Sequence, residues 1–262
     1  MDNLIQVILL GVIEGVTEFL PISSTGHLLI AEHWLGARSD LFNIAIQAGA
    51  ILAVVLIYRE RLLALATAPL KSEGHRYLHK LVVAFLITAA LGFLARHNGL
   101  HLPQTVAPIA WACIIGGVAI LLIEAHVAKL PPAETVTWKA AIVVGLAQVL
   151  AAVFPGTSRS AATIFAAMLS GVTSRPAATE FAFLLGIPTM FAATGYEMAK
   201  ALKDPDTVPV SWLDIGVGFA VATVVAFVVV KWLLRYIQTH RFTAFAWYRI
   251  TLGGVLLVFV PS

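Results

Sequence analysis

Ten apolar stretches follow one another along the chain, and they limit its fold more than any other feature. They fall at about 4–20, 26–36, 41–58, 78–95, 106–125, 138–154, 160–171, 178–199, 211–234 and 244–260. A helix needs roughly 20 apolar residues to cross about 30 Å of hydrocarbon, and several stretches are that long. Hydrophobic residues make up 60% of the 262 residues and charged residues 12%, against roughly 45–50% and 25% in a soluble domain. The sequence therefore predicts an all-α polytopic membrane protein.

Two pairs of stretches are joined too closely for both members to cross a membrane. Only residues 21–25 (PISST) separate the first pair, and only residues 155–159 (PGTSR) separate the second. The second member of each pair has only about a dozen apolar residues, which is too short to span. We expect two re-entrant helix hairpins, with tips at residues 21–27 (the first tip) and 155–160 (the second tip). Each tip should line a cavity, because non-helical backbone at that depth needs protein or water around it.

The other six stretches divide into two groups of three, and each group follows one hairpin. Residues 1–127 and 128–262 are thus predicted to be two repeats, each with a hairpin and three transmembrane helices. A constant offset of 134 matches Gly11 to Gly145, Pro21 to Pro155 and Ser24 to Ser158. Three spans per half make the second repeat insert upside down, and such inverted-topology repeats place their site at the repeat interface near the midplane.

The loops differ in basic residues, which predicts the orientation in the membrane. The side that holds the N-terminus carries four: Arg38, Arg96, Lys200 and Lys203. The other side carries eleven: Arg59, Arg61, Lys71, Arg76, Lys80, Lys129, Lys139, Arg175, Lys231, Arg235 and Arg241. By the positive-inside rule the second side is cytoplasmic, so both termini and the mouth of the first hairpin face outward. Arg159 and Arg249 are left out of the count because they lie at a tip and inside a segment.

Glu14 and Glu18 lie four residues apart, just before the first tip. A charged group inside a bilayer costs at least roughly 2.5–3.5 kcal/mol, so such carboxylates are functional candidates. On a helix they share one face. Two adjacent carboxylates repel unless a cation lies between them or one is protonated, which indicates a divalent-metal site or a coupled acid–base pair. Alternatively, the pair reaches outward water at a helix end.

The first tip combines hydroxyl side chains with the start of a helix. Ser23, Ser24 and Thr25 are good N-caps, and with Gly26 they form a helix N-terminus that suits an anion such as phosphate. Ser24 is a candidate nucleophile if a base lies nearby. His27 shares its face three residues on, as an acid or base or as a hydrogen-bonded packing residue.

The second tip repeats this arrangement and places Arg159 inside the membrane. Arginine is permanently charged and binds phosphate bidentately, so we expect an anionic partner. An ion pair with Glu14 or Glu18 is the alternative and is compatible with function. Thr163 shares the face of Arg159. The other predicted substrate-binding residues of this tip are Gly156, Thr157, Ser158 and Ser160.

Brought to one interface, the two tips offer an inventory for phosphoryl transfer: two carboxylates, an imidazole, hydroxyls, two helix N-termini and an arginine. Asn43 and Gln47 are expected to line the same cavity or to bridge helices. Glu124, near a segment end, is expected at the membrane interface. The net charge of +3 does not indicate nucleic acid, because topology accounts for the basic loops.

Residues 14–28 (EGVTEFLPISSTGHL) and 155–163 (PGTSRSAAT) resemble the motifs of the bacterial undecaprenyl-diphosphate phosphatase family, which is also associated with bacitracin resistance. The similarity in length and segment order covers essentially the whole chain. It implies hydrolysis of undecaprenyl diphosphate to undecaprenyl phosphate and inorganic phosphate, which recycles the lipid carrier for peptidoglycan synthesis. It also implies a divalent cation (Mg²⁺ or Ca²⁺), the bacterial inner membrane and a site open to the periplasmic side.

Combined with the residues, the resemblance suggests a mechanism. Glu14 and Glu18 would hold the cation, with Glu18 also acting as base, while Arg159 and its neighbours would bind the phosphate. Ser24 would form a transient phosphoserine, and His27 would orient it or protonate the leaving group. Direct attack by metal-activated water stays open.

A second class of function also fits the predicted architecture. Inverted repeats with broken helices are typical of transporters, so an ion-coupled transporter or flippase of polyprenyl phosphate lipids is the competing hypothesis. The sequence leaves the oligomeric state open.

Overall fold

The computed structural model describes residues 2–98, 105–203 and 211–259, which form eleven α-helices and no strand. The helices are α1 (Asp2–Thr17), α2 (Ser24–Leu35), α3 (Asp40–Ile57), α4 (Arg59–Ala66), α5 (Glu73–His97), α6 (Val106–Val127), α7 (Trp138–Val153), α8 (Arg159–Leu169), α9 (Arg175–Lys203), α10 (Trp212–Thr239) and α11 (Thr243–Phe259).

Five of the described helices, α3, α5, α6, α9 and α10, are long and apolar enough to cross a membrane. The remaining apolar helices are shorter, and α11 reaches 17 residues. Large apolar side chains cover the outside of the bundle, including Leu122, Val224 and Val228, which are each more than 60% exposed. Contiguous apolar surface of this kind marks contact with lipid. The predicted all-α, multi-pass membrane protein is confirmed.

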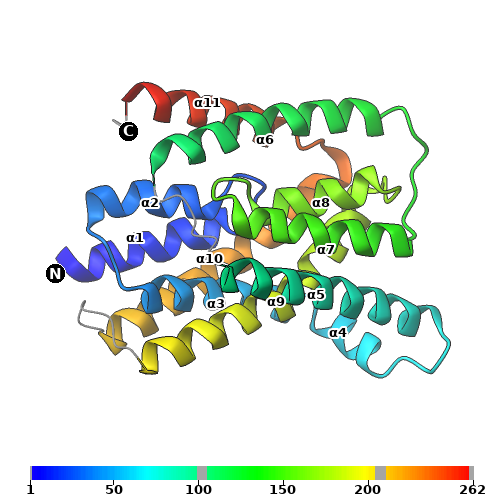
Figure 1. Ribbon diagram of the computed structural model, residues 1–262, viewed down its shortest axis with the longest axis horizontal. Coiled ribbons are helices and arrows are strands. Elements are labelled where there is room, and N and C mark those ends of the chain that lie inside the picture. The colour runs from blue at the N-terminus through cyan, green and yellow to red at the C-terminus, as the bar shows by residue number, and fades with distance from the viewer. Residues whose placement is uncertain (1, 99–104, 204–210, 260–262) are drawn as a thin grey trace.

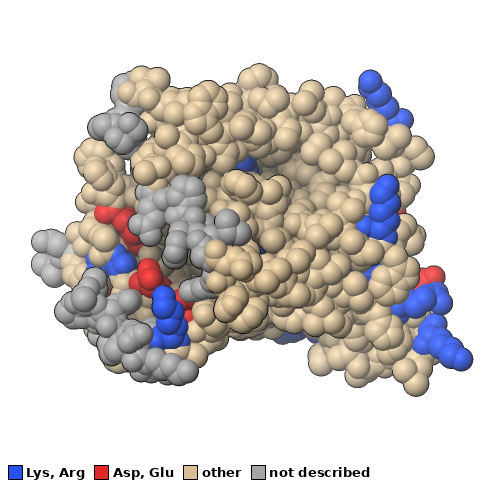
Figure 2. Space-filling model, in the orientation of Figure 1, with Lys and Arg blue, Asp and Glu red and all other residues tan. Residues whose placement is uncertain are grey.

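The two ends of the bundle differ in charge. The helices run mostly along the long axis, and the start of α1 lies at the same end as the end of α11 (Figure 1). Lys and Arg line the opposite end, from the end of α6 down to α4, while at the first end basic side chains lie beside acidic ones (Figure 2). Exposed residues there include Arg59, Lys71 and Lys129.

Two short helices each double back beside the preceding helix, α2 beside α1 and α8 beside α7 (Figure 1). The helices α2 and α8 have 12 and 11 residues. At 1.5 Å per residue they measure roughly 18 and 17 Å, well short of a bilayer core. Their breaks from α1 and α7 fall at the two predicted tips.

The first helices of the two pairs pack in exchanged fashion, because α1 lies against α10 and α7 lies against α5. Glycines permit both contacts. A Cβ at Gly11 would lie 2.9 Å from the carbonyl oxygen of Gly218, and one at Gly145 would lie 2.8 Å from that of Ala84. Real Cβ atoms do not approach carbonyl oxygens so closely. The two sequence-matched glycines therefore both allow a close contact between helix backbones.

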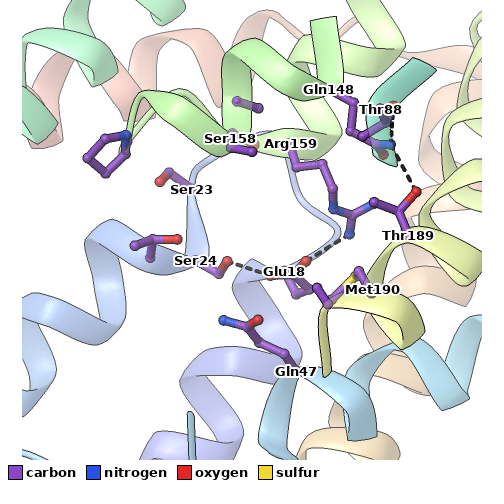
Figure 3. A pocket seen from close by; sticks show the side chains of 16 residues that line it. Glu18, Ser23, Ser24, Gln47, Thr88, Gln148, Ser158, Arg159, Thr189 and Met190 are labelled. Carbon is purple, nitrogen blue, oxygen red and sulfur yellow. Dashed lines mark hydrogen bonds and ion pairs between the residues drawn. The ribbon is translucent and has the colours of Figure 1, made fainter. Parts of the chain in front are cut away.

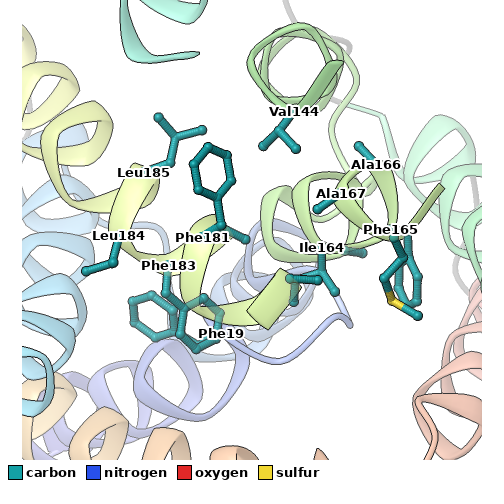
Figure 4. Packing of buried hydrophobic residues seen from close by; sticks show 14 of the residues in the cluster. Phe19, Val144, Ile164, Phe165, Ala166, Ala167, Phe181, Phe183, Leu184 and Leu185 are labelled. Atoms are coloured by element: carbon teal, nitrogen blue, oxygen red, sulfur yellow. The ribbon is translucent and has the colours of Figure 1, made fainter. Parts of the chain in front are cut away.

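A buried apolar cluster supports the region where the tips meet (Figure 4). Phe19 is fully buried in the loop after α1 and packs edge-to-face on Phe183 of α9, with ring centroids 5.1 Å apart. Ile164 of α8 and Phe181 of α9 are also fully buried. This packing fixes the residue next to Glu18 and thereby the position of its carboxylate.

Candidate active site

Each tip contains a serine that caps the following helix. Ser23 precedes α2 and accepts from the Gly26 N–H, while Ser158 precedes α8 and accepts from the Ala161 N–H. Both serines have positive φ, 75° and 68°, a conformation that costs non-glycine residues roughly 1–3 kcal/mol. Their hydroxyls are therefore used as N-caps, one of the two roles the sequence allowed.

The cap geometry corrects the predicted register between the repeats at the tips. A constant offset of 134 places Ser24 opposite Ser158. In the structure Ser23 and Ser158 are the equivalent caps, and Ser24 and Arg159 are the first residues of their helices. The connection before α2 is one residue longer than that before α8, which shifts the match.

The carboxylate of Glu18 lies between the first residues of α2 and α8 (Figure 3). Ser24 Oγ donates to Glu18 Oε2 at 2.5 Å, and Arg159 Nη2 donates to Glu18 Oε1 at 2.7 Å. The ion pair weighed for Arg159 is thus formed, with Glu18. A hydroxyl hydrogen-bonded to a carboxylate is the arrangement of a nucleophile and its base.

The guanidinium of Arg159 is only partly used by hydrogen bonds within the protein. Nη1 is buried and has no hydrogen-bond partner within the described part of the chain. The guanidinium carbon lies 5.7 Å from the centre of the Phe19 ring. A Cβ at Gly186 of α9 would overlap Nη1, so this glycine makes room for the arginine. The free N–H groups suit a phosphate oxygen.

Glu14 lies one turn before Glu18, and the Glu18 N–H donates to the Glu14 carbonyl oxygen at 3.0 Å. Its side chain is fully buried, and neither carboxylate oxygen has a hydrogen-bond partner among the described residues. A buried carboxylate in this state needs a proton or a cation. No described group of three or more His, Cys, Asp or Glu residues forms a metal cluster. Mg²⁺, however, commonly uses one or two carboxylates plus substrate phosphates, and the Glu14–Glu18 pair fits that pattern.

A cavity of about 250 Å³ lies between the two tips. Seven predicted site residues line it: Glu18, Ser23, Ser24, Thr25, Gly156, Ser158 and Arg159. Gln47 lines it as well, whereas Asn43 does not. The sequence did not indicate a role in the cavity for Thr88, Gln148 and Thr189, which also line it. Glu14, Gly26, His27, Thr157, Ser160 and Thr163 lie outside this lining.

Ser160 and Thr163 hold the backbone of the tips. Ser160 Oγ donates to the Leu20 carbonyl oxygen at 2.9 Å and thereby joins the second tip to the loop before the first. Thr163 Oγ1 donates to the Arg159 carbonyl oxygen at 2.8 Å. In this structure both predicted substrate-binding hydroxyls are engaged in positioning.

The His27 imidazole is held between Ser23 and Tyr248. Its Nδ1 lies 2.6 Å from the Ser23 carbonyl oxygen, and its Nε2 lies 2.6 Å from the Tyr248 hydroxyl. Because a carbonyl oxygen only accepts, Nδ1 carries the hydrogen and Nε2 accepts from Tyr248. His27 therefore contacts α11, and its ring nitrogens are both occupied.

Arg249 of α11 is fully buried and joins both tips to α6. It donates to the carbonyl oxygens of Pro21 at 3.3 Å, Gly156 at 2.9 Å and Thr157 at 3.0 Å. Further donors reach two carbonyl oxygens of α6. Arg249 was left out of the topology count, and no role was predicted for it. An arginine inside an apolar segment was the available signal.

Glu124, in the last turn of α6, is buried within the protein. It forms an ion pair with Arg175 of α9, with Nη2 and Oε2 2.5 Å apart, and accepts from the Phe242 N–H at 2.9 Å. The pair ties α6, α9 and the segment before α11 together at the basic end of the bundle.

Comparison with known proteins gives close matches over the whole chain. A family model described as bacitracin resistance protein BacA matches residues 7–255. An undecaprenyl-diphosphatase of Xanthomonas oryzae pv. oryzae is 57% identical over 262 residues, which cover 100% of this chain and 99% of the relative. One of Xanthomonas campestris pv. campestris is 56% identical, with 100% of both chains covered. One of Rhizobium etli is 58% identical over 97% of this chain and 96% of its own.

Proposed function

Because the chain belongs to the bacitracin resistance protein BacA family, we propose that its two tips form the active site of an undecaprenyl-diphosphatase. The protein is an integral membrane phosphatase that hydrolyses undecaprenyl diphosphate to undecaprenyl phosphate and inorganic phosphate. The product is the lipid carrier used in peptidoglycan synthesis. The observation that carries the site is the Glu18 carboxylate held between Ser24 and Arg159.

The hydrogen bond between Ser24 and Glu18 supports a covalent route. Ser24 Oγ attacks the terminal phosphorus and passes its proton to Glu18. The bond from this phosphorus to the bridging oxygen breaks, which releases undecaprenyl phosphate and leaves a phosphoserine. Water then hydrolyses the phosphoserine. Arg159 Nη1 and the N-termini of α2 and α8 bind the phosphoryl oxygens and stabilise their charge.

Glu14 and Glu18 are the residues that would hold a divalent cation, Mg²⁺ or Ca²⁺. The buried, unpartnered oxygens of Glu14 support this assignment. When bound, such a cation neutralises charge on the phosphoryl oxygens. Metal-activated water in direct attack is the alternative to the phosphoserine.

His27 does not line the cavity and acts on the site through the backbone of the first tip. Its bond to the Ser23 carbonyl oxygen fixes the N-cap next to Ser24, and Tyr248 fixes the ring. Direct protonation of the leaving group requires Nε2 to leave the Tyr248 hydroxyl. Positioning of Ser24 is therefore the role that the geometry favours.

The fold supports an inverted repeat of residues 1–127 and 128–262, with α1–α2 and α7–α8 as re-entrant hairpins. The exchanged packing of α1 on α10 and α7 on α5 supports the repeat, as do the equivalent caps Ser23 and Ser158. The sixth span is α11, whose 17 residues are just sufficient.

The charge difference between the ends supports an orientation in the bacterial inner membrane (Figure 2). The basic end is cytoplasmic, so both termini and the cavity mouth face the periplasm. The polyprenyl tail lies among the apolar helices while the diphosphate enters the cavity.

Purified protein in detergent separates this function from ion-coupled transport. We expect release of phosphate from undecaprenyl diphosphate with no gradient present. Glu18→Ala and Arg159→Ala should abolish release in the protein that remains folded. Folded wild-type protein that releases no phosphate would instead favour a transporter or flippase.

A further inference from the structure

Three polar side chains from three helices meet on one wall of the cavity, away from Ser24 (Figure 3). Gln148 of α7 donates from Nε2 to Thr88 Oγ1 of α5 at 3.1 Å and to Thr189 Oγ1 of α9 at 3.0 Å. Gln148 is 2% exposed, although it lines the cavity. The amide is thus fixed between two hydroxyls.

The hydroxyls also fix which way the amide points. Thr88 Oγ1 donates to backbone carbonyl oxygens, that of Ala84 at 2.9 Å and that of Gly145 at 3.0 Å. Thr189 Oγ1 donates to the Leu185 carbonyl oxygen at 2.9 Å. Because both hydroxyl hydrogens are used, both hydroxyl oxygens can only accept, and they take the two hydrogens of the amide. Gln148 Oε1 must point elsewhere, and it is buried without a partner in the described structure.

An acceptor without a partner can bind only a group that donates a hydrogen bond. A fully ionised phosphate oxygen only accepts, so it finds nothing at Gln148 Oε1, whereas water can donate to it. The phosphate has other partners in the same cavity, namely Arg159 Nη1 and the helix N-termini. The offset of 134 residues between the repeats also places Gln148 opposite Glu14, and a carboxylate on this wall would repel the phosphate.

We propose that Gln148 binds the water molecule that attacks phosphorus, an inference that rests on the proposed phosphatase function. Water donates one hydrogen to Gln148 Oε1, and its oxygen forms the new bond to phosphorus. The bond from phosphorus to Ser24 Oγ breaks. Glu18, which took the Ser24 proton in the first step, returns it to Ser24 Oγ and accepts one proton from the water, which then passes to bulk water. The other water proton stays on the released phosphate. Glu18 is the one carboxylate among the described residues that line the cavity.

Competition between water and methanol tests this assignment in detergent-solubilised protein with undecaprenyl diphosphate. Each acceptor gives its own product, inorganic phosphate or methyl phosphate. In Gln148→Ala, water loses its hydrogen-bond acceptor while the methyl group of methanol gains room. We expect the ratio of methyl phosphate to phosphate to rise about tenfold over the wild-type ratio, the size of a lost hydrogen bond. A purely structural role would lower both products equally and leave the ratio unchanged.

Two threonines provide a matched pair for the same measurement. Thr88→Val removes one hydroxyl that holds the amide, and we expect the product ratio to rise about threefold. Thr223 of α10 donates in the same way, to the Phe219 and Gly49 carbonyl oxygens, but does not line the cavity. Thr223→Val should therefore keep the wild-type ratio.

The ratio does not depend on how much of a variant is active, so partial misfolding does not disturb the comparison. An unchanged ratio in Gln148→Ala overturns the proposal. If that variant does not fold, an unchanged ratio in Thr88→Val overturns it instead. Failure of the phosphatase function itself looks different, since the wild-type protein would then form neither product.

Discussion

Glu18 and Arg159, 141 residues apart in the sequence, form an ion pair with Nη2 and Oε1 2.7 Å apart. Only 16% of the arginine side chain and 7% of the glutamate side chain are exposed. Removing one partner of such a pair leaves the other charge buried, which typically costs about 3–5 kcal/mol. The contact that assembles the site is therefore also part of what holds the two tips together.

Glu18→Gln separates the chemical role of this carboxylate from its shape. The amide oxygen still accepts a hydrogen bond from Ser24, but it cannot take the Ser24 proton. We expect kcat to fall by about 10²–10⁴, the usual contribution of a general base, with a smaller change in KM. Phosphate release over a range of substrate concentrations measures both. A kcat near that of the wild type would show that the proton leaves by another route.

Ser24→Ala distinguishes the phosphoserine route from direct attack by water. The variant should release no phosphate. When wild-type protein is stopped during turnover of substrate labelled in the terminal phosphate, it should be recovered as labelled phosphoserine protein. Ser23→Ala is the neighbouring control. It loses an N-cap worth about 1 kcal/mol but keeps the nucleophile, so it should still become labelled. Full activity in Ser24→Ala would exclude the covalent route.

Chelation tests the proposed cation through Glu14. We expect a chelator to stop phosphate release and Mg²⁺ or Ca²⁺ to restore it. Glu14→Gln removes one of the two carboxylates, so the metal concentration for half-maximal activity should rise about tenfold or more. Unchanged activity in excess chelator would instead assign a proton to Glu14, whose buried oxygens otherwise lack a partner in the described structure.

Local sequence signals were sufficient for the parts of the site that lie within one tip. Pro21 and Pro155 mark the helix breaks, and a serine after each proline caps the next helix, which begins at Ser24 or Arg159. Ionisable groups in apolar segments pointed to Glu18 and Arg159, because a membrane protein retains few charges at depth.

Contacts between distant segments could not be predicted from local sequence signals. The His27 ring is oriented by Tyr248, and the Gln148 amide is held by threonines of two other helices. No local pattern encodes such pairings. The one-residue shift between the tips was missed for a related reason, since the caps Ser23 and Ser158 set the register rather than the identical residues.

Arg249→Met tests whether the tips depend on a residue outside the cavity. Methionine has a similar length to arginine but is apolar. The substitution therefore leaves the carbonyl oxygens of Pro21, Gly156 and Thr157 without their donor. Each unsatisfied buried acceptor costs about 1–3 kcal/mol, so we expect a clearly lower Tm and a loss of activity in the protein that remains folded. Arg235→Met, at an exposed position on α10, should change stability by no more than about 0.5 kcal/mol. Equal Tm values for the two variants would contradict the role of Arg249.

Two glycines of α9 test how closely Arg159 must be placed. A Cβ at Gly186 would overlap the Arg159 Nη1 atom, whereas a Cβ at Gly195 would meet no atom within 4 Å. Gly186→Ala should push the guanidinium away from the phosphate position and lower kcat/KM by about 10²-fold, the usual effect of a 1 Å misplacement. Gly195→Ala should keep wild-type activity and gain about 0.5–1 kcal/mol of stability, because alanine favours the helix at an exposed position. Phosphate release and thermal unfolding, measured on both variants, separate the two effects. If Gly186→Ala matched Gly195→Ala in kcat/KM, the position of Arg159 would not limit the reaction.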